Sequence, residues 1–106
     1  MNSLKDRRCR PLQGPPMSAA EVAAQLAALP QWALVDGAIE RRFDFPDFHR
    51  TMAFVNAVAW IAHAEDHHPD LHVGYGHCTL RYATHSVGGL SINDFICAAK
   101  VDALLS

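Results

Sequence analysis

Apolar residues recur every three or four positions in three stretches of the chain, a spacing that predicts three amphipathic helices. Two stretches begin with a capping box, in which a serine and an acidic residue three positions later each satisfy a backbone N–H group of the other. Ser18 and Glu21 open a helix predicted over about residues 19–29, and Ser91 and Asp94 open the last helix. The apolar positions of these two helices are Val22, Leu26, Leu29, Phe95, Ala98, Val101 and Leu105.

The middle helix begins after Asp47, whose carboxylate can accept hydrogen bonds from the first backbone N–H groups of a helix. Its apolar stripe reaches towards His63, and Pro69 limits how far the helix can continue, because proline lacks the N–H group that a helix interior needs. The predicted stripe consists of Phe48, Met52, Val55, Ala59 and Ala62.

Four strand-like runs predict two pairs of neighbouring strands. Asp36 and Gly37 separate the first two runs, and this dipeptide suits the positive backbone angles of a tight hairpin turn. Gly74 and Gly76 lie between the other two runs, which predicts a second hairpin or a close strand pair. The runs cover residues 32–35, 39–45, 71–75 and 78–85.

The elements follow one another as helix, two strands, helix, two strands, helix. This order predicts an α+β domain in which three helices pack on one face of a four-stranded antiparallel sheet. We assign the domain to residues 17–106. Residues 1–16 end in a run rich in proline and glycine that buries little, so we expect a flexible tail, with Met17 as a candidate native start.

The composition argues against several classes of protein. Among 106 residues, 50% are hydrophobic and 19% are charged, which favours one well-buried domain. The formal net charge of −2 offers no basic surface for nucleic acid, and no apolar run is long enough to cross a membrane. Three cysteines without a C-x-x-C pair favour a reduced, cytoplasmic setting. The basic N-terminal residues lack the apolar stretch of a secretory signal, although an Arg-rich transit peptide stays open.

Histidines are the compositional anomaly, since four of the seven lie between His63 and His72. His63 and His67 would share one helix face if the middle helix extends that far, whereas His68 would point elsewhere. An imidazole titrates at about pH 6.5, so it can donate or accept a proton near neutrality. Two or three imidazoles around one substrate can therefore protonate a leaving hydroxyl and take a proton from a ring nitrogen.

Two other interpretations of the histidines stay open. Histidines at a helix end can interact with the negative end of its dipole or cap its carbonyl groups. His63 and His67 also have the spacing of half a zinc site, but the metalloprotease pattern needs Glu directly after the first histidine, and Glu65 comes one position late. His77 and Cys78 are neighbours on a strand and face opposite ways, which argues against a shared site.

The run His67-His68-Pro69 is followed by an aromatic residue six positions after the proline, a histidine ten positions later and an aspartate nine positions beyond that. The later residues of this pattern are Tyr75, Thr84-His85, Gly89-Leu90-Ser91 and Asp94. The pattern resembles the signature of the pterin-4a-carbinolamine dehydratase family, the 4a-hydroxytetrahydrobiopterin dehydratases. The similarity extends through the order of helices and strands, over about residues 17–106.

The resemblance implies roles for individual residues. His67 and His68 match the adjacent pair that lines the pterin pocket and supplies acid–base catalysis, and His85 matches the third active-site histidine, on the opposite strand end. Tyr75 could pack on its strand or stack on a pterin. No metal ion and no redox cofactor are implied. The substrate-binding residues that the resemblance implies are His63, Pro69, Thr84, Ser86, Val87 and Asp94.

Two points stay open at this level. Asp94 could serve only the capping box of the last helix, or it could belong to the active site. Many relatives carry a carboxylate four residues before the first catalytic histidine, where this chain has His63. The group that orients His67 is therefore undetermined, and Glu65 or Asp66 could take that role.

The family's reaction removes water from a 4a-hydroxytetrahydropterin and leaves a quinonoid dihydropterin. This reaction recycles the cofactor of aromatic amino acid hydroxylases, usually phenylalanine hydroxylase, and the family forms homo-oligomers, either dimers or tetramers. A different class stays open as well, because animal relatives act as dimerisation cofactors of a homeodomain transcription factor. The domain could thus be a non-catalytic interaction module, although the intact set of His67, His68 and His85 favours catalysis. We expect neither a nucleic acid nor a membrane as a direct partner.

Overall fold

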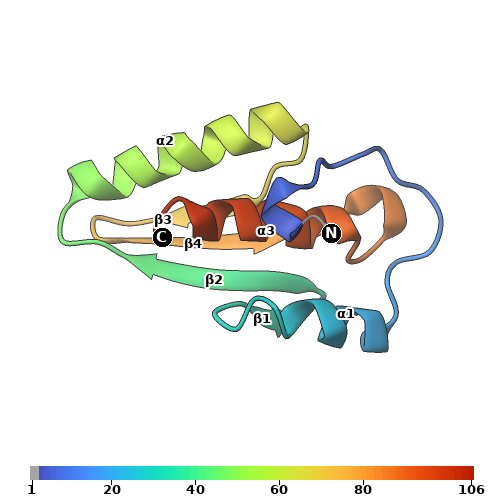
Figure 1. Cartoon of the computed structure of the whole chain (residues 1–106). Coiled ribbons are helices and arrows are strands. Elements are labelled where there is room, and N and C mark those ends of the chain that lie inside the picture. Colours follow the sequence, from blue (N-terminus) through green and yellow to red (C-terminus); the bar gives the residue numbers. More distant parts are fainter. Residues whose placement is uncertain (1–2) are drawn as a thin grey trace.

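The computed structural model describes residues 3–106, which form a four-stranded antiparallel sheet, in the order β1-β2-β4-β3, and three helices (Figure 1). The fold class predicted from the sequence is confirmed. In chain order the elements are η1 (Leu4–Asp6), α1 (Ala19–Leu26), β1 (Ala33–Val35), β2 (Ala38–Asp44), α2 (Phe48–Glu65), β3 (Asp70–Val73), β4 (His77–Tyr82), η2 (His85–Val87) and α3 (Ile92–Ala103).

The predicted capping residues begin all three helices. Ser18 and Ser91 form complete capping boxes with the acidic residues three positions later, and the Asp47 carboxylate accepts a hydrogen bond from the Arg50 N–H at 2.8 Å. Helix α1 ends three residues earlier than predicted, because the chain tightens after Leu26 into turns with hydrogen bonds between residues three apart. This tightening places Leu29 in the core.

The first hairpin has the predicted turn, with Asp36 and Gly37 at φ angles of 49° and 80°. Strand β4 ends at Tyr82, earlier than predicted, because the backbone of Thr84 pairs with that of Gly89 and closes a loop. His85 consequently lies on the short helix η2 inside this loop rather than on a strand.

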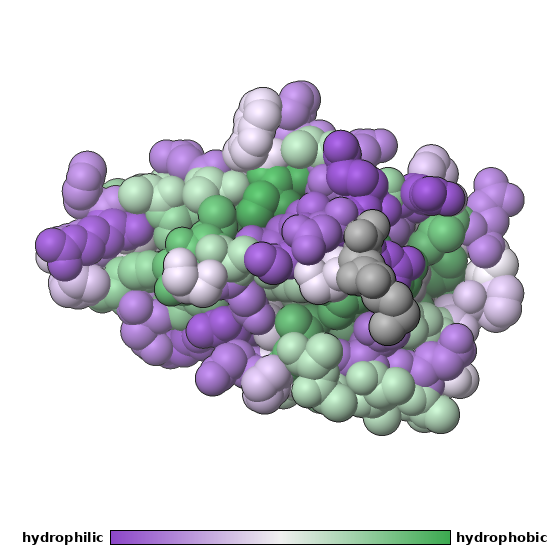
Figure 2. All heavy atoms as spheres, in the orientation of Figure 1, coloured by the Kyte–Doolittle hydropathy of each residue, from purple (hydrophilic) through white to green (hydrophobic). Residues whose placement is uncertain are grey.

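Side chains of β4 alternate between a buried and a more open face of the sheet, as the period of two requires. The buried face meets α3 and α2 in one core, where burying each large apolar side chain contributes about 1.5–3 kcal/mol. Figure 2 shows hydrophobic residues gathered between α2 and α3, with hydrophilic residues around them. Fully buried members of this core include Ile39, Val58, Leu80, Tyr82, Phe95 and Val101.

The buried face of α2 differs from the predicted stripe. Phe54 and Val58 enter the core together with Thr51, whereas Phe48 is 50% exposed and Ala59 is exposed. The helix carries apolar residues on more than one side, including the exposed Trp60, so spacing alone did not identify the side that packs.

The N-terminal segment lies against the domain in this structure, with residues 1–2 outside the described ones. Helix η1 contacts α3, where the Lys100 ammonium group donates to the Lys5 carbonyl at 2.9 Å. Cys9 packs on the core, and the Met17 N–H donates to the Leu90 carbonyl at 2.8 Å. Among residues 3–10 only Leu4 and Cys9 are half-buried and the others are exposed, and the predicted mobility of residues 1–16 stays a prediction.

Candidate active site

The end of α2 directs the first two histidines of the motif. Helix α2 ends at Glu65, and Asp66 adopts the left-handed conformation with φ 51° and ψ 43°. The His67 N–H then donates back to the Ala62 carbonyl at 3.1 Å, which closes the helix in the manner of a Schellman motif. His67 and His68 consequently leave the helix axis. The helix thus stops short of His67, so the condition under which His63 and His67 would share one helix face is not met.

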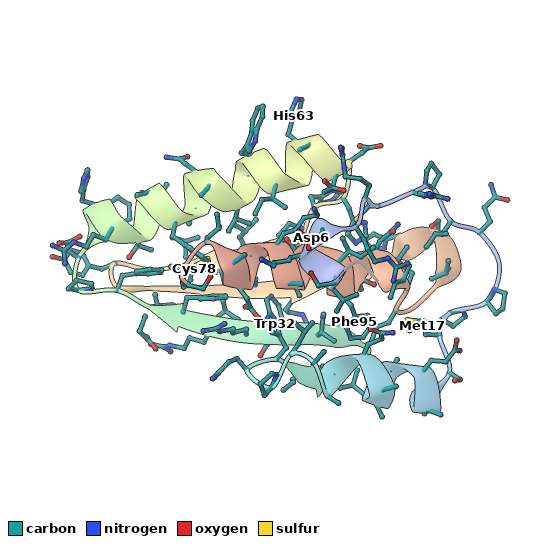
Figure 3. The ribbon with its side chains drawn as sticks, viewed as in Figure 1. Asp6, Met17, Trp32, His63, Cys78 and Phe95 are labelled. Atoms are coloured by element: carbon teal, nitrogen blue, oxygen red, sulfur yellow. The ribbon has the colours of Figure 1, made fainter. Side chains whose placement is uncertain are left out.

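His63 stays on α2, exposed to solvent and beside the Trp60 ring at 5.6 Å between ring centroids. Figure 3 shows its side chain pointing away from the body of the domain. The structure therefore separates His63 from the other residues of the motif.

His67 forms a short hydrogen bond with a buried carboxylate. Its Nε2 atom lies 2.6 Å from Oδ1 of Asp94, which is fully buried at the start of α3. The His67 ring also stacks on the Tyr82 ring, with centroids 5.9 Å apart and planes 9° apart. Only 13% of the His67 side chain is exposed, so both the hydrogen bond and the stacking hold the imidazole in one orientation.

Asp94 holds this position through its second oxygen. Its Oδ2 atom accepts hydrogen bonds from the Thr84 hydroxyl at 2.8 Å and from the Ser91 N–H at 2.9 Å. The hydroxyl groups of Thr84 and Ser91 lie 2.7 Å apart, so these three side chains form one buried network. Asp94 therefore caps α3, as the sequence suggested, and contacts His67 at the same time.

Asp94 is thus the group that orients His67, a role that the sequence left open between Glu65 and Asp66. Glu65 points to the N-terminal segment, where it accepts a hydrogen bond from the Cys9 N–H at 2.8 Å, and Asp66 is exposed. An ionised carboxylate can only accept a hydrogen bond, so when Asp94 is ionised the proton of this bond lies on Nε2 of His67. Nδ1 is then the nitrogen that can take up or give back a proton, as in other Asp–His pairs.

His68 and His85, the other two histidines of the motif, line a cavity of about 110 Å³. His68 lies just before β3 and His85 lies on η2, and the pairing of β3 with β4 brings these segments together. The remaining lining residues are Asp36, Gly37, Ala38, Asp70, Arg81 and Ala83. The Arg81 guanidinium in this lining is held by Glu40 at 2.9 Å.

The other predicted site residues lie in the Asp94 network, beside the cavity of His68 and His85, or elsewhere on the protein. Thr84 belongs to the Asp94 network, and Pro69 is buried between His68 and Asp70. Ser86 is exposed on η2, and the buried Val87 lines a different hollow.

Tyr75 does not pack on a strand, and its stacking on a pterin stays a prediction. It lies in the turn after β3, is 69% exposed and stacks on Phe48 with centroids 6.5 Å apart. Tyr82, rather than Tyr75, stacks on His67, the first histidine of the motif. The alternation of Cys78, Leu80 and Tyr82 along β4 is the signal that could have indicated its inward direction.

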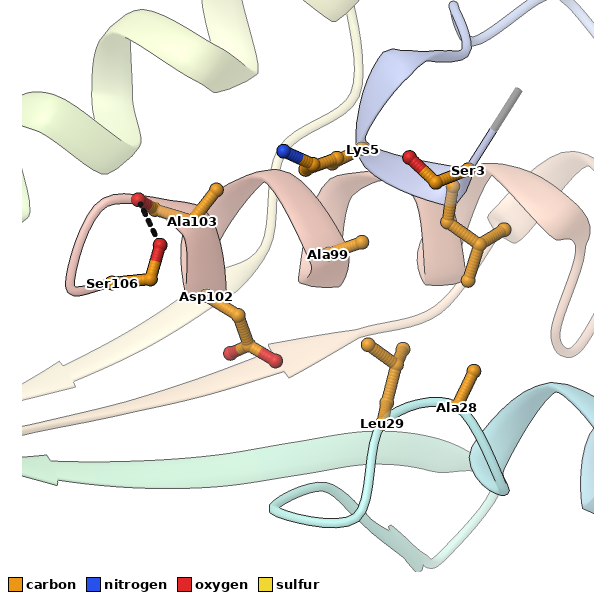
Figure 4. Close-up of a pocket in the computed structure, with 9 residues that line it drawn as sticks. Ser3, Lys5, Ala28, Leu29, Ala99, Asp102, Ala103 and Ser106 are labelled. Atoms are coloured by element: carbon orange, nitrogen blue, oxygen red, sulfur yellow. Dashed lines mark hydrogen bonds between the residues drawn. The ribbon is translucent and has the colours of Figure 1, made fainter. Parts of the chain in front are cut away.

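A larger hollow of about 450 Å³ lies between η1, residues 28–29 and the end of α3 (Figure 4). Its carboxylate, Asp102, is already bound by the Trp32 indole N–H at 2.9 Å and by Arg41 at 2.7 Å. No histidine lines this hollow, so acid–base chemistry points to the His67 and His68 region instead.

Residues 3–106 contain no group of three or more His, Cys, Asp or Glu side chains placed to hold a metal ion. Within the same residues, no helix is both long and apolar enough to span a membrane.

The chain is a small α+β domain with histidines directly after α2 and on η2. The family model of pterin 4 alpha carbinolamine dehydratase matches residues 15–104, and the chain belongs to this family. A Nitrosomonas eutropha protein that carries the family's name is 56% identical, over 96% of this chain and 93% of its own length. A Stenotrophomonas maltophilia protein of the same name is 53% identical, over 95% of this chain and 90% of its own length.

Solved structures agree with this assignment. A transcriptional coactivator/pterin dehydratase from Brucella melitensis superposes with a TM-score of 0.82 at 33% identity, over 86% of this chain and 99% of the other. A pterin dehydratase-like RuBisCO assembly factor of the alpha-carboxysome has a TM-score of 0.57 at 24% identity, over 69% and 84% of the two chains, which shows a shared fold.

Proposed function

We propose that this protein is a lyase that converts 4a-hydroxytetrahydrobiopterin to quinonoid dihydropterin and water by histidine acid–base catalysis. The observation that carries the proposal is the 2.6 Å contact between His67 and the buried Asp94, next to a cavity lined by His68 and His85. Membership of the dehydratase family gives the class of substrate.

The reaction needs two proton transfers and no electron transfer to a cofactor. The bond between C4a and the hydroxyl oxygen breaks, and the oxygen leaves as water after accepting a proton. N5 loses its proton, and the freed electron pair forms the double bond between N5 and C4a. Suitably placed acids and bases contribute about 10²–10⁴-fold to such a step.

One histidine is held by a carboxylate and the others line a cavity, and this difference suits the two proton transfers. His67 is held by Asp94 with one proton fixed on Nε2, so Nδ1 can exchange a proton with the substrate. His85 is exposed and His68 shares its cavity, so either can be protonated from solvent. We infer that a histidinium, from His67 or His68, protonates the leaving hydroxyl, with His85 as its partner in proton transfer or in hydrogen bonding to the substrate.

The biological role that follows is recycling of the pterin cofactor of an aromatic amino acid hydroxylase, with phenylalanine hydroxylase as the expected functional partner. We also infer a homo-oligomer, a dimer or tetramer. Membership of the pterin 4 alpha carbinolamine dehydratase family supports a pterin substrate, on which the recycling role rests.

The test is stopped-flow absorbance of enzymatically generated 4a-hydroxytetrahydropterin, with and without the protein and with a chelator. Wild type should accelerate decay to the quinonoid product whether or not chelator is present. The double variant His67→Ala/His85→Ala should stay folded and lose most of the activity. His63→Ala is the matched control, since it removes an exposed histidine from α2 and should leave turnover unchanged. Unchanged turnover in the double variant would refute the histidine assignment.

A second candidate function is a non-catalytic interaction module. Two observations favour this candidate: the exposed aromatic residues Phe48, Trp60 and Tyr75, and the similarity to the transcriptional coactivator/pterin dehydratase from Brucella melitensis. If folded wild type fails to accelerate the decay, binding assays against transcription factors become the next measurement.

A further inference from the structure

The N-terminal segment joins the two helix ends that carry His67 and Asp94. At the end of α2, the Arg8 guanidinium donates to the Ala64 carbonyl at 3.0 Å and pairs with the Glu65 carboxylate at 2.9 Å. The Cys9 N–H donates to the other oxygen of Glu65 at 2.8 Å. Residues 8 and 9 thus satisfy both oxygens of a side chain that is only 5% exposed.

The same segment binds the first turn of α3. The Arg10 N–H donates to Oδ1 of Asn93 at 3.2 Å, and Nδ2 of Asn93 donates to the Arg10 carbonyl at 2.6 Å. Asn93 is buried, so this reciprocal pair is shielded from water. The Cys9 thiol lies 3.6 Å from the Asn93 carbonyl and 3.5 Å from the Cys97 sulfur, one turn further along α3.

These anchors are the immediate neighbours of the active-site pair. Glu65 precedes the left-handed Asp66, which turns the chain so that His67 leaves the helix, and Asn93 directly precedes Asp94. A displacement of either helix end would therefore change the contact between His67 and Asp94.

Glu65 depends on this segment for its charge balance. Burial acts to raise the pKa of Glu65, but the hydrogen bonds from Cys9 and Arg8, with the positive charges of Lys100 and Arg8, hold its pKa below the usual value. Lys100 alone is 3.8 Å away, so without residues 8 and 9 the carboxylate would lose its close partners. A buried carboxylate without hydrogen bonds is unfavourable, and the end of α2 would rearrange to expose it.

We propose that residues 8–10 form a positioning strap that fixes the His67–Asp94 pair, with Arg8 and Glu65 as positioning residues for the dehydratase reaction. This inference rests on the proposed function for its effect on turnover, but the strap itself acts on a hydrogen bond that can be observed without substrate. Residues 8–10 lie outside the stretch of the chain that the family model matches.

The experiment compares full-length wild type with Arg8→Met, Glu65→Gln and the control Lys5→Met. Lys5→Met removes one positive charge from the same segment but none of the side-chain contacts of the strap. Arg8→Met is the milder strap variant, because Arg8 is 70% exposed and Glu65 keeps its hydrogen bond from the Cys9 N–H. The first readout is the NMR signal of the His67 Nε2–H proton, whose position and exchange with water report its hydrogen bond to Asp94. The second readout is kcat and KM for dehydration.

Both strap variants should speed exchange of the His67 proton and lower kcat by about 10-fold with KM nearly unchanged, as is typical of lost positioning. Lys5→Met should match wild type in both readouts. Arg8→Lys should lose less kcat than Arg8→Met, because lysine keeps the positive charge. An unchanged His67 signal in folded Arg8→Met would overturn the strap, whatever happens to kcat. If instead His67→Ala remains fully active, the catalytic proposal fails, while the NMR signal still decides whether the strap holds the pair.

Discussion

Tyr82 offers a direct energetic test of the buried surroundings of His67. Its side chain is fully buried between the sheet and α3, and within residues 3–106 its hydroxyl has no hydrogen-bond partner. Burial, assisted by nearby Cys97, Cys9 and Asp94, raises the pKa of this phenol. We predict that Tyr82→Phe stabilises the protein, because it removes a polar group that loses its hydration on folding and gains nothing in return.

The expected change in the free energy of unfolding for Tyr82→Phe follows from two opposing effects. A buried hydroxyl without a partner costs about 1–3 kcal/mol. Phenylalanine retains the ring that stacks on His67 and leaves a void smaller than a methyl group, which costs less than about 1 kcal/mol. The net gain should therefore be about 1 kcal/mol in the free energy of unfolding, or about 4–8 °C in Tm for a domain of this size.

Urea unfolding at constant m-value measures this change, and Tyr75→Phe is the matched control. Tyr75 is 69% exposed, so loss of its hydroxyl should alter stability by less than about 0.5 kcal/mol. If Tyr82→Phe destabilised the protein by about 1 kcal/mol or more, the hydroxyl would have to be hydrogen-bonded in the native state, and the reasoning would be refuted.

Three further predictions concern the neighbouring groups. Asp94→Asn should lower kcat by about 10²–10⁴-fold, because an amide NH₂ facing Nε2 favours the wrong tautomer of His67; imidazole nitrogen shifts that match wild type would argue against this. The pKa of Glu65 in the folded protein lies below its usual value of 4.5, so ionised Glu65 stabilises the fold above pH 4.5. This stabilisation is lost as the pH falls through the folded pKa. When the free energy of unfolding is measured against pH, Glu65→Gln should therefore lack this acid-dependent loss of stability. Diamide should take two hydrogens from Cys9 and Cys97 and leave an intramolecular disulfide, since the sulfurs lie 3.5 Å apart. The cross-link should raise unfolding stability by about 2–4 kcal/mol, and mass spectrometry that finds both thiols intact would contradict it.

Local signals in the sequence predicted much of the fold. The capping boxes at Ser18 and Ser91 and the turn at Asp36-Gly37 depend only on residues a few positions apart, and all three occur as expected. The side of α2 that packs could not be predicted in the same way, because apolar residues surround much of that helix. Its choice depends on contacts with distant strands, such as the hydrogen bond at 2.9 Å from the Thr51 hydroxyl to the Tyr75 carbonyl.

The arrangement of the candidate site could not be predicted from the sequence, and the roles of its residues stay predictions. The motif indicated His67, His68, His85 and Asp94, yet no periodicity reported the left-handed turn at Asp66 that separates His67 from the helix. The partner of His67 lies 27 residues away, and the segment that holds Glu65 lies 56 residues away. Contacts over such distances depend on the completed fold, so a single sequence without relatives gives no signal for them.

Asp94 takes part both in the first turn of α3 and in the contact that holds His67. One of its oxygens closes the first turn of α3, and the other holds His67. If that turn frays, the cap and the contact with the imidazole are lost in the same event, long before the sheet opens. The free energy of this local opening, rather than that of global unfolding, would then set the fraction of molecules whose His67 is correctly held at any moment. Hydrogen exchange at the Asp94 amide would consequently report the population of the competent state.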